Sequence, residues 1–154
     1  MKLLLFIIFL ISGAASAEDY SHLKSEKYWK DTPTVYVCQD SNIDLEIVSR
    51  AIKYWADAGY EINPTPKRKS CALPSAYGQI VIDNFRDGNP RNVNGTSKLR
   101  NYEGYKYFTR VDIKIKKSLS KEVEIFKHEL GHAVGLNDEH NDPRSIMVHK
   151  KVYD

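Results

Sequence analysis

The chain has 154 residues and a formal net charge of +3 at pH 7, because 23 Lys and Arg residues face 20 Asp and Glu residues. Such a balanced charge gives no case for nucleic-acid binding, and the length suits one compact domain with its own core. The sequence contains no internal repeat, linker or low-complexity tract that would divide this domain.

Residues 1–17 have the pattern of a secretory signal peptide. Lys2 gives a positive start, residues 3–11 are apolar, and Ala15 and Ala17 form an Ala-x-Ala cleavage site. The apolar run is too short to span a bilayer, so we expect no stable membrane anchor. We therefore predict a signal peptide at 1–17 and a single mature domain at 18–154, in a secreted, extracellular or periplasmic protein.

The two cysteines agree with export to an oxidising compartment. Cys38 and Cys71 are the only pair, so a disulfide has one possible connectivity. Closing a loop of about thirty residues would stabilise the fold by roughly 3–4 kcal/mol on the chain-entropy estimate. The alternative is two buried free thiols.

The first half of the mature chain predicts one strand and one helix. Residues 18–30 are polar with scattered aromatics and should form an N-terminal arm, and 34–38 reads as a strand. Apolar residues then recur at helical spacing over 43–55, with Gly59 as the stop. The prolines and the Lys-Arg-Lys run of 64–69 predict a solvated loop.

The second half predicts two strands and a central helix. Residues 79–82 form a short apolar run typical of a buried strand. Residues 109–116 alternate apolar and polar residues, as in a strand with one solvent-exposed face. Asp83–Arg100, between them, is rich in Asn, Gly and charge, which predicts a long surface loop. Ser120 is the expected N-cap of the helix that follows.

That helix carries the sequence HELGHAVGLNDEH, from His128 to His140. His128 and His132 are one helical turn apart and project from one face, where they can bind zinc. Glu129, beside the first ligand, can reach a metal-bound water, whose pKa zinc lowers to about 7. An H-E-x-x-H pattern arises by chance only ~0.01 times in a chain of this composition. The alternative is a helix whose two histidines are exposed or satisfied in the core.

Two glycines and a methionine, within and after this pattern, occupy positions that suit a metal site. Gly131, between the histidines, would let another element approach closely, and Gly135 suits a left-handed turn at the helix C-terminus. That turn could bring a third ligand back to the metal. Residues 145–147 form a short apolar element placed to underlie the site.

The segment resembles the metzincin metalloproteases, whose motif H-E-x-x-H-x-x-G-x-x-H/D precedes a methionine turn. Its amino-acid sequence is most similar to that of the matrixin branch. The residues that match are His128, Glu129, His132, Gly135 and Met147. The third-ligand position is Asp138, similar to the snapalysin-type variant. His140 is the competing candidate, because zinc generally prefers imidazole.

The resemblance implies an α+β zincin-like fold, with a small mixed twisted sheet packed on two long helices, the second of which carries H-E-x-x-H. It also implies that an antiparallel edge strand forms the upper rim of the cleft, where extended substrates add through main-chain hydrogen bonds. The aromatic stretch Tyr102, Tyr105, Tyr107 and Phe108 lies where this strand is expected. The alternative is ordinary surface tyrosines in a hairpin.

The expected activity is that of a secreted zinc endopeptidase acting on proteins or peptides, as a monomer. His128, His132 and Asp138 would hold one catalytic Zn²⁺, with Gly135 and Met147 supporting the site, and Glu129 would be the general base. The alternatives are a catalytically weak or inactive metal-binding module of the same fold, and a small basic protein that binds anionic surfaces.

Calcium is a second possible cofactor. The loop that contains Asp83, Asp87, Asn89 and Asn92 could hold Ca²⁺, as loops in related enzymes do. Its spacing matches no defined calcium motif, which favours a solvated loop.

Overall fold

The computed structural model describes residues 19–71, 77–86 and 93–148. The predicted signal peptide lies outside these ranges, as do Asp87, Asn89 and Asn92. The elements within them are η1 (Ser21–Leu23), β1 (Tyr28–Trp29), β2 (Thr34–Cys38), α1 (Leu45–Asp57), β3 (Lys67–Lys69), β4 (Gln79–Asn84), β5 (Gly95–Arg100), β6 (Tyr107–Phe108), β7 (Arg110–Ile115), η2 (Lys117–Leu119) and α2 (Val123–Ala133).

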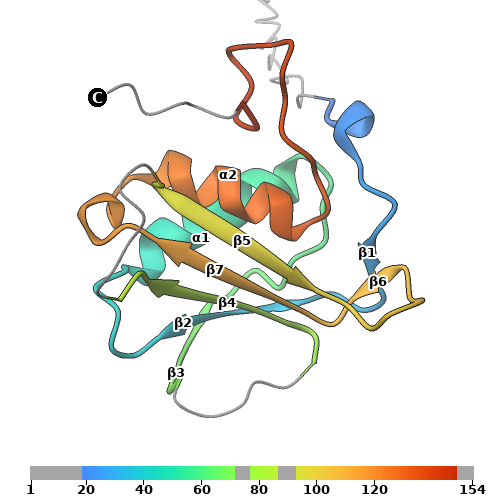
Figure 1. Ribbon diagram of the computed structural model, residues 1–154. Helices are drawn as coiled ribbons and strands as arrows, with labels where there is room; N and C mark the ends of the chain where they lie inside the picture. Colours follow the sequence, from blue (N-terminus) through green and yellow to red (C-terminus); the bar gives the residue numbers. More distant parts are fainter. Residues whose placement is uncertain (1–18, 72–76, 87–92, 149–154) are drawn as a thin grey trace, which may run out of the picture.

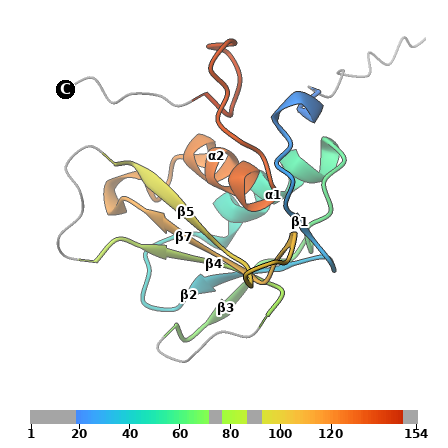
Figure 2. The same cartoon turned by 45° about the vertical axis from the view of Figure 1, so that its right-hand side comes forward.

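In the described part of the chain, β3, β2, β4, β7 and β5 form a five-stranded sheet in that order. The first four strands are parallel, and β5 pairs antiparallel to β7 at the edge, from Gly95 opposite Ile115 to Arg100 opposite Arg110. Both helices lie on one face of the sheet (Figures 1 and 2). The predicted α+β class, with a mixed sheet and two helices, is confirmed.

The apolar pattern of the sequence accounts for how these layers pack. α1 begins at its N-cap Asp44, whose side chain accepts the backbone N–H of Glu46. In β7, Val111, Ile113 and Ile115 are buried while the residues between them are half-buried, as the alternation predicts. The core between sheet and helices includes Trp55 of α1, the largest fully buried side chain among the described residues, whose indole N–H donates to the Lys127 carbonyl of α2 at 2.7 Å.

The predicted disulfide is confirmed. Cys38, at the end of β2, is bonded to Cys71, just after β3, with a Cα–Cα distance of 5.4 Å. The bridge therefore closes a loop that contains the whole of α1 and joins neighbouring strands of the sheet. In the described ranges, neither helix is long and apolar enough to cross a membrane.

Two polar stretches that were predicted as loops contain edge strands. Lys67–Lys69 forms β3, and the last part of Asp83–Arg100 forms β5. Both predictions were wrong for one reason. An edge strand is hydrogen-bonded to a neighbour on one side only and often carries polar or charged side chains. Its sequence therefore need not show the apolar run or the apolar–polar alternation by which the other strands were predicted. Asp83 lies inside β4, with its carboxylate 2.7 Å from the Lys114 ammonium, rather than in an open loop.

Two further expectations are corrected. The aromatic stretch is not the edge strand of the main sheet, because Tyr107 and Phe108 form β6, which pairs with β1 in a separate two-stranded sheet. Ser120 is not the N-cap of α2, which starts after Glu122. Ser120 is instead buried, and its hydroxyl donates to Asn42 Oδ1 at 2.8 Å, which joins the segment before α2 to the segment before α1.

Candidate metal centre

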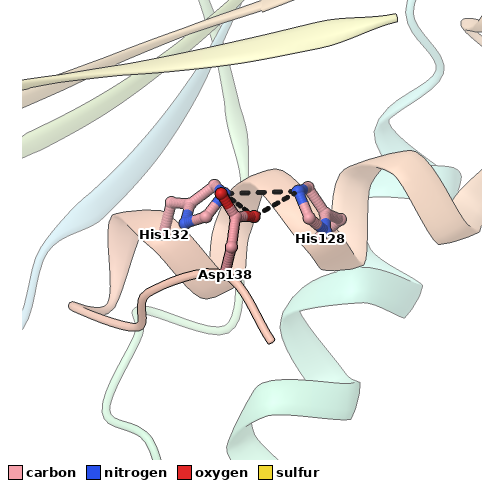
Figure 3. A group of neighbouring side chains, drawn as sticks. All are labelled: His128, His132 and Asp138. Atoms are coloured by element: carbon pink, nitrogen blue, oxygen red, sulfur yellow. Dashed lines mark hydrogen bonds and ion pairs between the residues drawn. The ribbon is translucent and has the colours of Figure 1, made fainter. Parts of the chain in front are cut away.

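Helix α2 brings the two histidines of the H-E-x-x-H pattern together on one face. His128 and His132 are one turn apart, and their Nε2 atoms approach to 3.2 Å (Figure 3). Both side chains are partly buried, with 15% and 20% of their surface exposed. The helix therefore presents two imidazole nitrogens to one point at the surface of the core.

A glycine turn reverses the chain directly after this helix. Gly135 has φ +97°, a conformation that favours glycine. The N–H of Gly135 donates to the His132 carbonyl and that of Leu136 to the Gly131 carbonyl, both at 3.0 Å. These two bonds form a Schellman motif. They end the helix and send the following residues back along the face that carries the histidines.

Asp138 lies on this returning segment and faces both histidines. Its Oδ1 is 3.6 Å from His128 Nε2 and 3.4 Å from His132 Nε2 (Figure 3). One ligand atom from each of the three residues lies within 4.8 Å of the others. His140 is exposed and, among the described residues, belongs to no such group. Of the two candidates for the third ligand, the fold brings only Asp138 to the histidines.

Each histidine ring is oriented by a backbone carbonyl on its Nδ1 side, which leaves Nε2 facing Asp138. His128 Nδ1 lies 2.9 Å from the Ile146 carbonyl, and His132 Nδ1 lies 2.9 Å from the Leu136 carbonyl. A carbonyl only accepts, so each Nδ1 carries a proton, and Nε2 is the nitrogen that a neutral ring would offer to a metal. Two Nε2 atoms and a carboxylate oxygen therefore converge, an arrangement that a cation would stabilise.

The donor set fits a zinc ion. Ligand atoms ~2.0–2.2 Å from a tetrahedral zinc are separated by about 3.3–3.6 Å, close to the 3.2–3.6 Å between these three atoms. Asp138 Oδ1 is also the one buried side-chain oxygen or nitrogen in the described ranges without a hydrogen-bond partner. Buried polar atoms are normally paired, so this oxygen is suited to a ligand.

Met147 packs against the turn of α2 that carries the histidines. It is fully buried and contacts Gly131, where an added Cβ would overlap Met147 Sδ and lie 2.7 Å from Trp55 Cζ2. A side chain at position 131 would therefore displace Met147 and Trp55, which pack directly on the helix backbone. The preceding residue, Ile146, supplies the carbonyl that orients His128.

Glu129 is held against the edge strand by residues that the sequence did not point to. The carboxylate is 3% exposed, and Ser97 Oγ of β5 donates to Glu129 Oε2 at 2.6 Å. A Cβ added to Gly95 would lie 2.5 Å from Glu129 Oε1, so only glycine leaves room there. Gly95 and Ser97 lie in a stretch predicted as loop, so no strand periodicity drew attention to them.

Sequence reasoning also missed the contact between the N-terminal arm and the loop that carries Asp138. His22 Nε2 is 2.6 Å from the buried carboxylate of Glu139. This hydrogen bond, aided by the Asn141 backbone N–H, lowers the pKa of Glu139 to about 2, and the same contact raises the pKa of His22. Glu139 is therefore charged at neutral pH, directly beside the candidate metal ligand.

In comparisons with known proteins, no family model and no curated protein matches the chain.

Proposed function

We propose that this protein is a secreted zinc-dependent endopeptidase of the metzincin type, with His128, His132 and Asp138 as the metal ligands. One observation carries the proposal: two imidazole nitrogens converge with a buried carboxylate oxygen that has no hydrogen-bond partner, and Glu129, next to His128 in the helix, is buried. A structural zinc site needs the ligands but not the glutamate, and it normally has four protein ligands. Three ligands with an adjacent carboxylate favour hydrolysis.

The chemistry divides between the metal and this chain's own groups. Bound zinc would supply an acidic water and polarise the carbonyl under attack. Glu129 would accept the proton of the attacking water and deliver it to the leaving amine. Ser97 donates to one oxygen of that carboxylate and so limits its rotation.

The edge strand β5 suits the binding of an extended peptide. It pairs with β7 on one side and lies beside α2, the helix that carries the ligands (Figure 1). An extended substrate adding to its other side would form main-chain hydrogen bonds that do not depend on substrate sequence. Protein or peptide substrates are therefore the class that we propose, and the disulfide is consistent with their hydrolysis outside the cytoplasm.

The test is casein hydrolysis by the purified chain lacking residues 1–17, before and after removal of metal with a chelator. We expect activity to be lost with the metal and restored by one equivalent of zinc. Stoichiometric zinc binding without cleavage of any protein substrate would instead support a metal-binding module. A chain that binds no zinc would contradict both functions.

A further inference from the structure

The N-terminal arm (Asp19–Lys27) is anchored in the core beneath the candidate metal centre. Tyr20 and Leu23 are buried, with 4% and 7% of their surface exposed. The Tyr20 ring packs on Trp55 at a centroid distance of 5.0 Å, and its hydroxyl is hydrogen-bonded to that of Tyr54 in α1. The arm thus has fixed attachment points on the helix that packs against α2.

From these anchors the arm pairs with the turn that follows α2. Ser25 N–H donates to the Gly135 carbonyl at 2.7 Å, and Asn137 N–H donates to the Leu23 carbonyl at 2.9 Å. These bonds flank an antiparallel bridge between Lys24 and Leu136. Figure 2 shows the arm (blue) beside the segment after α2 (red). The residue before Asp138 is therefore held by the backbone of the arm.

The residue after Asp138 is held by a side chain of the arm. Glu139 is 4% exposed and accepts three hydrogen bonds, from His22 at 2.6 Å and from the backbone N–H groups of His140 and Asn141 at 2.8 and 2.6 Å. Its own N–H donates to the Met147 carbonyl at 2.8 Å. Of these four hydrogen bonds, the one from His22 connects Glu139 with the N-terminal arm, 117 residues away in the chain.

We propose that the N-terminal arm positions the third metal ligand, with His22 as the positioning residue that acts through Glu139 on Asp138. The inference rests on the proposed metal site. Asp138 lies between two residues that the arm holds, so its carboxylate is presented to the histidines at little entropic cost on binding. Without the arm, ordering the backbone of this loop would cost conformational entropy when the metal binds.

The experiment measures zinc affinity of the metal-stripped protein by competition with a chromophoric chelator. His22→Ala should weaken zinc binding about tenfold or more, within the ~10–100-fold range typical when a group that supports a metal ligand is removed. The His22 side chain is 59% exposed, so this variant should fold. His22→Gln should retain most of the affinity, because its amide N–H can reach Glu139 in place of the imidazole.

A second background separates positioning from general stabilisation. In Asp138→Ala, the further change His22→Ala should leave zinc affinity unchanged, since the ligand through which His22 acts is absent. Glu26→Ala, at an exposed position of the same arm, is the matched control and should bind zinc normally. Equal losses in both backgrounds, or normal affinity in His22→Ala, would overturn the proposal while leaving the metal site intact. Absence of zinc binding in the unmodified protein would instead refute the proposed function.

Discussion

The two α-helices in the described part of the chain end in the same way but bury different kinds of residue. Each is followed by a glycine with positive φ, Gly59 after α1 and Gly135 after α2, and each glycine begins a Schellman turn. The residues that α1 buries are all apolar: Val48, Ala51, Ile52 and Trp55. α2 also buries apolar residues, but among them are a carboxylate, Glu129, and a glycine, Gly131.

Packing alone explains the buried residues of α1, whereas in α2 it explains Gly131 but not the buried carboxylate of Glu129. A buried carboxylate is costly unless it is hydrogen-bonded, and glycine inside a helix is about 1 kcal/mol less favourable than alanine. α2 contains both within three residues, next to two histidines whose Nε2 atoms converge. Departures from stabilising choices are expected where a chain serves function, so the contrast supports the proposed site on α2.

The largest effect is expected from replacing the buried carboxylate of α2. Glu129→Gln keeps the shape of the side chain and removes the proton acceptor, so casein hydrolysis should fall about 10²–10⁴-fold while zinc content stays at one equivalent. The measurement is initial rate per bound zinc. Since Glu129 is buried and Gln is uncharged, the thermal midpoint should not decrease.

The matched control for this variant is Glu46→Gln, which makes the same change at an exposed position in the first turn of α1. It should leave the rate unchanged. Full activity in Glu129→Gln would show that the buried carboxylate that distinguishes α2 from α1 has no role in catalysis. A contaminating protease is excluded by purifying both variants in parallel, because it would give them equal rates.

The next largest effect concerns the third ligand. Asp138→Ala should reduce zinc affinity by more than the ~10–100-fold seen for groups that only support a ligand, whereas His140→Ala should reduce it little. The reason is that Asp138 Oδ1 lies within 3.6 Å of both Nε2 atoms, while His140 is exposed. Chelator competition on both variants measures this directly. A larger loss in His140→Ala would reverse the assignment.

The elements that bury an apolar face could be predicted from the sequence, and the polar edge strands could not. The strand at β2, the stripe of α1 and the alternation of β7 were predicted because burial of one face leaves a period in the sequence. The edge strands β3 and β5 were not, because polar residues on a strand paired on one side carry no such period. The disulfide was predictable because two cysteines allow one pairing.

For the site, local spacing was sufficient and long-range contacts were not. His128, Glu129 and His132 come from one helical turn, so sequence spacing places them together. The choice between Asp138 and His140 depended on the path of the chain after Gly135, which spacing alone left open. Ser97 contacts Glu129 across 32 residues, and His22 contacts Glu139 across 117. No local pattern signals pairs that only the tertiary fold brings together.

The smallest expected effect tests the glycine that distinguishes α2 from α1. Gly131→Ala should destabilise the protein by about 1–3 kcal/mol, although alanine is the better helix former, because the added methyl would overlap Met147 and lie against Trp55. Urea unfolding measures this loss. Adding Met147→Ala should make room for the methyl, so the double variant should be less destabilised than the sum of the single changes. If the Gly131→Ala protein were more stable than the unmodified chain, the side chains of Met147 and Trp55 would leave enough room for a methyl group at position 131. In that case Gly131 would no longer distinguish α2 from α1, and the contrast would rest on Glu129 and the histidines alone.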